Sequence, residues 1–188
     1  IDLKAYHLVS GLIALQRKRY SDAVTSLQKS VELGENRTLV FLGLAQGHFH
    51  QQQYVDALKA LKTSNPAYGG IVAGYLMAGQ SYWALEKKSD ALAVLERASR
   101  QFPDQVLALR QRLLYLVELG LYHEAIVASD SLMRHAQVKE EDFMAVAHAL
   151  RKARQPFQAI TLLEQARIYQ PSSTRLKLLL AHAYHEAS

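Results

Sequence analysis

The sequence contains no cysteine. This absence excludes disulfide bonds, a catalytic thiolate and metal sites built on thiolate ligands. A cysteine-free chain is compatible with the cytosol and with an oxidising compartment such as the periplasm, so the localisation stays open. Carboxylates are also outnumbered by cations, which leaves a formal net charge of +5. That mild basic excess favours acidic partners without requiring nucleic acid.

The residue patterns that carry chemistry are also missing. There is no G-x-S-x-G motif, no paired-carboxylate loop and no dinucleotide-binding fingerprint. His48 with His50, and His182 with His185, are close enough in sequence to share a metal, but no Asp/Glu–His set completes a tetrahedral site. We therefore predict a protein that is not an enzyme and that uses no cofactor and no metal.

One uncharged stretch has the length of a membrane span. It runs from Thr63 to Leu85, but it includes Asn65, Pro66 and Gln80, which are poorly suited to hydrocarbon. We therefore predict no membrane span here. The chain opens at Ile1, without an initiator Met or a signal-like segment, and we interpret it as a fragment or a processed form.

What the sequence does contain is a repeat. Five equally spaced alanines are the core of the pattern: Ala23, Ala57, Ala91, Ala125 and Ala159. Small, aromatic and apolar residues recur in phase with them, which predicts pairs of amphipathic helices packed antiparallel. The sequence thus predicts an all-α solenoid, a single domain over 1–188. Its five units are 4–37, 38–71, 72–105, 106–139 and 140–173, with 174–188 a terminal helix or a partial sixth repeat.

The least regular junction follows the second unit. Pro66 disfavours helix at Asn65, and Gly69 and Gly70 follow at once. This cluster is either a bend in the array or an ordinary loop.

The pattern resembles the tetratricopeptide repeat, a helix–turn–helix unit of about 34 residues with the signature W-x₂-L-G-x₂-Y…A-x₃-F…P. The residues of the third unit that occupy those places are Tyr75, Ala78, Gly79, Tyr82, Ala91, Leu95 and Pro103. Lys88 and Pro156 depart from it, since other units have Tyr there. The resemblance implies a right-handed superhelix whose first helices line a concave groove that binds peptide segments. The positions that grip chaperone tails in some members are apolar or glycine here, so the resemblance does not imply a co-chaperone.

Helical spacing predicts which residues face the groove. In the first three units we expect an apolar partner-binding face: Leu8, Leu12, Leu15, Leu39, Leu42, Gln46, Phe49, Leu76, Met77, Gln80 and Trp83. Toward the C-terminus we expect a basic end: Arg110, His148, Arg151, Lys152, Arg175 and His182. The carboxylates Glu118, Glu141 and Glu186 leave that end almost neutral.

These features lead to one main hypothesis and two alternatives. The main one is a protein–protein interaction scaffold that binds an amphipathic segment, with an acidic residue of the partner meeting Arg110 or Arg151. Self-association or cover of the groove in cis is also open, because large apolar patches mark interaction sites of either kind.

The second class of function is binding of an anionic polymer, either a secreted polysaccharide or RNA. RNA is disfavoured, because the groove aromatics lie away from the basic end. The third is a purely structural or oligomerisation module. The short loops and the Gln/Ala/Leu-rich composition are typical of bacterial chains.

Overall fold

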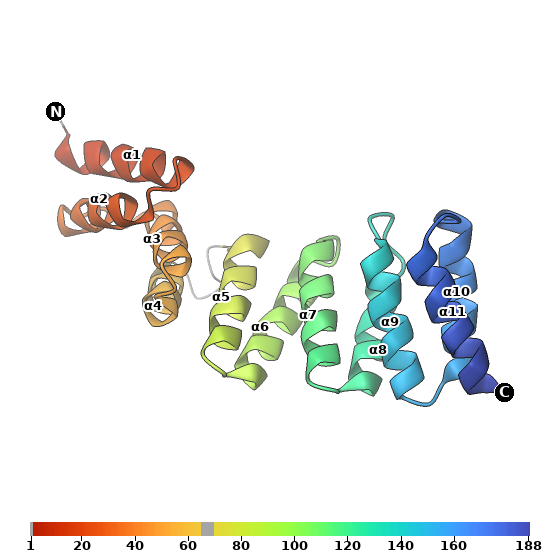
Figure 1. Ribbon diagram of the computed structural model, residues 1–188. Coiled ribbons are helices and arrows are strands. Elements are labelled where there is room, and N and C mark those ends of the chain that lie inside the picture. The colour runs from red at the N-terminus through yellow and green to blue at the C-terminus, as the bar shows by residue number, and fades with distance from the viewer. Residues whose placement is uncertain (1, 65–69) are drawn as a thin grey trace. The chain divides into compact units, whose positions relative to one another are not determined.

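The computed structural model describes residues 2–64 and 70–188, and across them the chain forms eleven α-helices and no strand (Figure 1). The first helices of the pairs are α1 (Leu3–Gln16), α3 (Thr38–His50), α5 (Val72–Ala84), α7 (Val106–Glu118), α9 (Glu140–Lys152) and α11 (Thr174–Ala187). The second helices are α2 (Tyr20–Glu32), α4 (Tyr54–Ser64), α6 (Lys88–Gln101), α8 (Tyr122–Leu132) and α10 (Pro156–Tyr169). The all-α class and the predicted helix pairs are confirmed.

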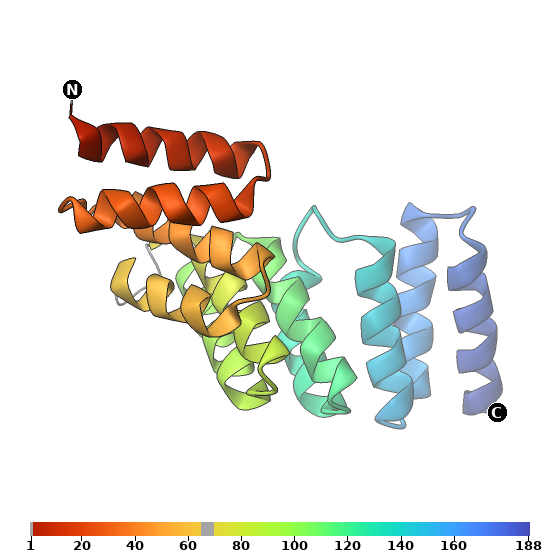
Figure 2. The ribbon, with the colours of Figure 1, turned by 60° about the vertical axis from the view of Figure 1, so that its left-hand side comes forward.

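The chain divides into two compact units, Ile1–Val94 and Leu95–Ser188. Within the first unit, α1 packs on α2, α2 on α3, α3 on α4 and α4 on α5. Figure 2 shows α1 and α2 as an antiparallel pair. Within the second unit the same order joins α7, α8, α9, α10 and α11. Each helix therefore buries its apolar stripe against its neighbours in sequence, as expected of a repeat array.

The constant repeat length explains the core. The first helices from α3 to α11 begin at equal intervals along the chain, and the second helices from α2 to α10 begin at the same interval. The alanines that define the repeat are all fully buried, at 0% exposure, and Leu27, Leu61, Leu95 and Leu163 are equally buried one helical turn later. A side chain as small as Ala at this place lets the two helices of a pair approach closely. The prediction that these residues set the helix packing is confirmed.

The turn inside each pair repeats as well. Each of the five turns has one residue in the left-handed region, with φ between 58° and 72°, and these residues are spaced by one repeat: Lys18, Gln52, Glu86, Gly120 and Arg154. The N–H of the next residue bonds back to the carbonyl five residues earlier, as from Arg19 to Ala14 at 2.9 Å. This bonding satisfies carbonyls that the helix end leaves open. Only one of the five turns uses glycine, so glycine did not reveal this position in the sequence.

The last helix and the irregular junction differ from the regular helix pairs. In α11, Leu180 and Ala183 are buried, whereas Leu178 and Tyr184 are exposed, so this helix has the packing of the first helix of a pair. In the irregular junction, Asn65, Pro66 and Gly69 lie outside the described residues, and Gly70 has a φ of +68°.

Candidate protein-binding surfaces

The first helices line one side of each unit. In the first unit α1 contacts α3 and α3 contacts α5, and in the second unit α7 contacts α9 and α9 contacts α11. These contacts place the first helices of successive repeats side by side within each unit. We call the side formed by the first helices the inner face of each unit, and the opposite side the outer face.

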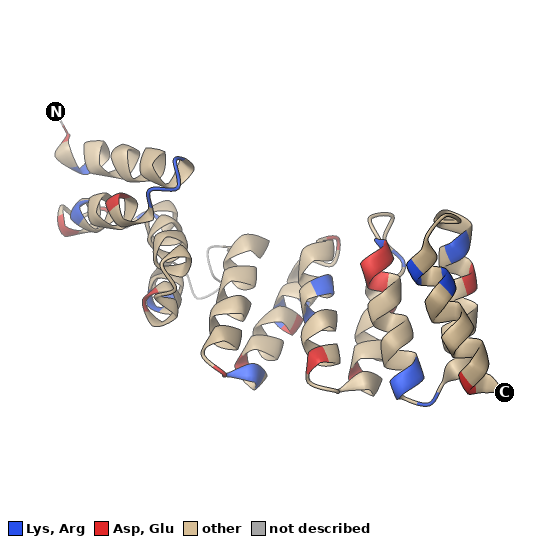
Figure 3. Cartoon of the chain, viewed as in Figure 1, with Lys and Arg blue, Asp and Glu red and all other residues tan. Residues whose placement is uncertain are grey.

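The inner face of the first unit is almost free of charge. Helices α3 and α5 contain no Lys, Arg, Asp or Glu, and their ribbons are entirely tan in Figure 3. Leu39 at the start of α3 is 50% exposed, and Gln46 is also exposed. An exposed leucine beside a polar amide, on a surface without charge, is suited to an apolar partner with hydrogen-bonding groups.

The structure corrects the predicted apolar face at two positions. Leu8 and Leu15 are only 4% and 8% exposed, so they pack between helices and do not reach a partner. For Leu15 the reason is the close packing of α3 at Gly43, where an added Cβ would lie 2.8 Å from Leu27 of α2 and 3.2 Å from Leu15 of α1. Leu15 fills the space that the glycine leaves. The remaining members are half-buried: Leu12, Leu42, Phe49, Leu76, Met77, Gln80 and Trp83.

Aromatic contacts hold the end of the inner face near the turns. The rings of Tyr20 and His50 stack at 4.3 Å, and Phe49 meets His50 and Tyr54 edge-on at 5.6 and 5.8 Å. One repeat further, the ammonium of Lys88 lies 3.9 Å from the centre of the Trp83 ring. These contacts restrict the two large inner-face rings, which reduces the ordering cost of binding a partner.

The same set of inner-face side chains occurs twice in the first unit. Helix α3 and helix α5 each present a leucine, a glutamine and an aromatic ring at equivalent positions of successive repeats: Leu42, Gln46 and Phe49, then Leu76, Gln80 and Trp83. Because these positions are four and three residues apart, the three side chains share one face of each helix. A partner lying across α3 and α5 therefore meets the same chemistry at both.

The inner face of the second unit is charged, and its charges are paired internally. The guanidinium of Arg110 donates from Nε and Nη2 to the two oxygens of Asp142, both at 2.7 Å. The side chains are 17% and 1% exposed. Asp142 also accepts the backbone N–H of Lys139 at 2.9 Å, which caps α9. The hydrogen bond from Arg110 to the carboxylate raises the pKa of Arg110 above its ordinary value.

Arg151 is held in the same way. Its Nε and Nη2 donate to the carboxylate of Glu186 at 2.8 and 2.6 Å. This bond raises the pKa of Arg151 and lowers that of Glu186. The expectation that a partner's acidic residue meets Arg110 or Arg151 is corrected by these pairs, since both guanidinium groups already bind a carboxylate of the chain. Lys152 and Arg175 stay exposed.

His148 adds little positive charge to this face. It lies edge-on to Tyr122, with the ring centres 5.9 Å apart. Burial lowers its pKa, and the nearby charges of Lys152 and Arg151 lower it further, which favours the neutral imidazole near pH 7. His182, in contrast, is exposed.

Sequence reasoning missed three residues of this face. Asp142 was overlooked, although an acidic residue at the third position of a helix is the usual partner of an N-terminal cap. Leu107 and Leu114 of α7 are 54% and 41% exposed and were not assigned to any face. The repeat register would have found Leu107, because it is equivalent to the exposed Leu39.

Metal sites and membrane spans were two further possibilities raised by the sequence. Residues 2–64 and 70–188 contain no cluster of three or more His, Asp or Glu side chains placed to hold a metal. Among the same residues, no helix combines the length and the apolar character needed to cross a bilayer.

Comparison with protein families gives two matches. Residues 16–98 match the model described as "Anaphase-promoting complex, cyclosome, subunit 3", and residues 76–134 match the model described as "Tetratricopeptide repeat". A search of curated proteins finds no match.

Solved structures with the same fold are similar to this chain over nearly all its length. MamA superimposes with a TM-score of 0.80 at 15% identity, covering 93% of this chain and 95% of MamA. YrrB, described as "a TPR protein with an unusual peptide-binding site", gives 0.73 at 18% identity, with coverages of 95% and 90%. The C-terminal part of a TPR protein from Cytophaga hutchinsonii gives 0.81 at 16% identity, with coverages of 94% and 70%. At these identities the similarity shows the fold alone.

Proposed function

Because the chain belongs to the tetratricopeptide repeat family, we propose that it is an interaction scaffold whose first unit binds an apolar segment of a partner protein on its inner face. The protein performs no chemistry in this role. It supplies a preformed surface, and the partner supplies the side chains that cover it. The TPR fold supports interaction with proteins in general, and the residues assigned here are our own proposal.

One observation carries the proposal: α3 and α5, two helices without a charged residue of their own, present leucine, glutamine and aromatic side chains at equivalent positions. Leucine and the rings of Phe49 and Trp83 gain free energy when a partner's apolar side chains remove them from water. The exposed amide of Gln46 offers donors and an acceptor, which suits the backbone of a bound segment.

Trp83 makes this proposal testable, because it is the only tryptophan in the chain. Peptides selected from a random library against the full chain are titrated while the emission of Trp83 is recorded. Binding on the inner face shifts that emission, because the partner changes the polarity around the indole. We expect the affinity to change little with salt, since apolar contacts are not screened.

Substitution of Leu39 by Lys is the matching variant. This residue is half-exposed, so the change leaves the core intact, but it places a charge in the apolar face. We expect binding to weaken by about tenfold, corresponding to about 1.4 kcal/mol. Val127→Lys is the control: this side chain of α8 is exposed and lies in the second unit, so the change leaves binding unchanged. Two results together would refute the inner-face site: the selected peptides do not change the emission of Trp83, and they bind the Leu39→Lys variant as tightly as the wild type. A steep loss of affinity with salt would favour the anionic polymer instead, and a size that grows with protein concentration would favour self-association.

A further inference from the structure

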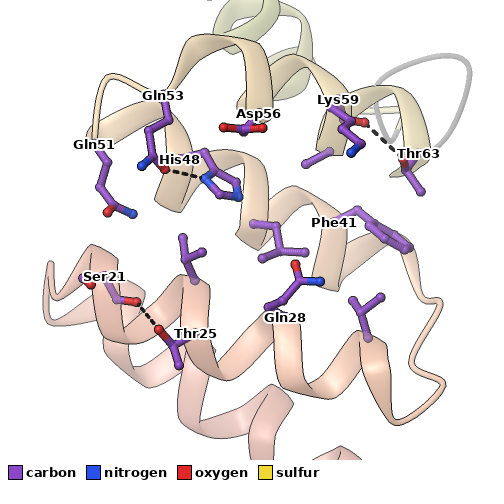
Figure 4. Close-up of a pocket in the computed structure, with 14 residues that line it drawn as sticks. Ser21, Thr25, Gln28, Phe41, His48, Gln51, Gln53, Asp56, Lys59 and Thr63 are labelled. Carbon is purple, nitrogen blue, oxygen red and sulfur yellow. Dashed lines mark hydrogen bonds between the residues drawn. The ribbon is translucent and has the colours of Figure 1, made fainter.

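The outer face of the first unit has two hollows in successive repeats. The first outer hollow, of about 530 Å³, lies between α2, α3 and α4, and Figure 4 shows its polar rim, with Gln28, Gln53 and Lys59 among the labelled residues. The second outer hollow, of about 370 Å³, lies between α4, the end of α5 and the turn that follows. Both belong entirely to the first unit, and neither uses the inner face.

The repeat register makes the two hollows directly comparable. Of the eight described residues that line the second hollow, seven have their counterpart, one repeat earlier, in the lining of the first. The counterparts differ sharply in chemistry. Uncharged Thr25, Gln28 and Gln53 of the first hollow are replaced in the second by three lysines: Lys59, Lys62 and Lys87.

The floor changes in the same comparison. Val24, His48 and Gln51 of the first hollow become Leu58, Tyr82 and Leu85 in the second. The second hollow is therefore both more apolar and more basic than the first, although the backbone around the two is equivalent.

The second hollow brings three lysines together without a carboxylate among its described lining residues, although Lys59 also lines the first hollow, together with Asp56. Within the described part of the chain, none of their ammonium groups forms an ion pair, whereas Lys29 pairs with Glu32 and Lys88 with Glu86. The described residues that line the second hollow include no carboxylate. Three like charges around one apolar depression repel one another, and an anionic partner relieves that repulsion.

We propose that the second outer hollow binds an acidic amphipathic helix of a partner protein. The hollow runs beside α4, where Leu58, Lys59 and Lys62 share one face, so a helix can lie along it in the manner of helix-in-groove recognition. Its apolar side chains fill the space above Leu58, Tyr82 and Leu85, and its carboxylates pair with the lysines on the rim. A nucleic acid fits less well, because Tyr82 is the single aromatic ring among the described lining residues on which a base can stack.

The probe is a synthetic peptide of about 18 residues, with Leu along one helical face and Glu on the flanks. Its binding to the full chain is measured by fluorescence anisotropy of a label on the peptide. The decisive variant is K59T/K62Q/K87Q, which gives the three lysine positions the side chains of their counterparts in the first hollow and leaves the floor of the second unchanged. Each exposed charge contact contributes about 1.4- to 5-fold in affinity, so we expect the triple variant to bind at least about 3-fold more weakly. Raising the salt concentration weakens wild-type binding in the same direction.

Three controls isolate the hollow. K4Q/K18Q/K177Q removes the same net charge elsewhere and leaves binding essentially unchanged, because distant charges are screened. A scrambled peptide of identical composition, without the apolar stripe, binds more weakly than the amphipathic one. Leu39→Lys, on the inner face, leaves this binding unchanged, so that a failure of this proposal can be told apart from a failure of the proposed inner-face site. If the triple variant loses its helical circular dichroism signal, the single variant K62E replaces it, and we expect K62E to bind the peptide more weakly as well.

Several results would overturn the proposal. The amphipathic peptide could fail to bind the wild type, or the two triple lysine variants could lose the same affinity for it. The scrambled peptide could bind as tightly as the amphipathic one, or Leu39→Lys could weaken binding of the amphipathic peptide. A single-stranded oligonucleotide that binds the same lysines more tightly than the peptide would also overturn it.

Discussion

Substitution of Arg110 by methionine tests the buried ion pair of the second unit. Methionine has a similar length and no charge, so the change leaves the Asp142 carboxylate, which is 1% exposed, without its guanidinium. Removing one partner of a buried pair costs about 3–5 kcal/mol, because the remaining charge stays desolvated. The backbone N–H of Lys139 still donates to that carboxylate, which keeps the expected cost near the lower end of this range.

The assay is thermal and urea unfolding followed by far-UV circular dichroism. For a chain of this length, 1 kcal/mol corresponds to roughly 2–4 °C in Tm, so a cost of about 3 kcal/mol predicts a decrease of about 6–12 °C. Hydrogen exchange adds a local readout, because the amides at the start of α9 should lose protection first. Asp142→Asn removes the charge itself and should cost less, about 1–3 kcal/mol, since the half-buried Arg110 can turn toward water.

Arg112 provides the matched control on the same helix. Its guanidinium lies 3.9 Å from Glu96, and both side chains are partly exposed. Arg112→Met should therefore cost no more than about 1 kcal/mol. Equal effects of Arg110→Met and Arg112→Met, both under about 1 kcal/mol, would refute the reasoning that burial makes the Arg110 pair costly to break.

Three further predictions concern stability. Leu95→Ala should cost about 2–5 kcal/mol in urea unfolding, because Leu95 is fully buried; a cost below about 1 kcal/mol would contradict the register. Gly120→Ala should destabilise and Lys18→Gly should stabilise the fold, each by about 1 kcal/mol, because φ is positive at both residues; opposite signs in a melting experiment would contradict this. The guanidinium of Arg37 lowers the pKa of Glu35 from 4.5 to about 2. Since the folded-state pKa is depressed, the stabilisation is present above pH 4.5 and is lost as the pH falls toward 2; Glu35→Gln should flatten the pH dependence of Tm in that range, and an unchanged profile would count against it.

Much of the fold was predictable because it depends on local, periodic information. Ala91 and Leu95 lie in a pattern that recurs five times, and each recurrence independently specifies the same helix pair. Even the boundary of α5 at Val72 coincides with the predicted start of the third unit. The inner face of the first unit was partly predictable as well, since helical spacing placed Leu39 and Gln46 on the side where the structure has them exposed.

The sequence by itself therefore determined the helix pairs, their register and the apolar character of α3 and α5. Only the tertiary structure decided which of the inner-face residues reach solvent. Leu15 is buried because Gly43 on another helix lets α1 approach closely, and Arg110 is neutralised because Asp142, on the first helix of the next repeat, lies across the helix contact. Spacing along one helix defines a face, but it does not report what the neighbouring helix places against that face. Burial and ion pairing arise between helices, so they follow from packing and not from periodicity.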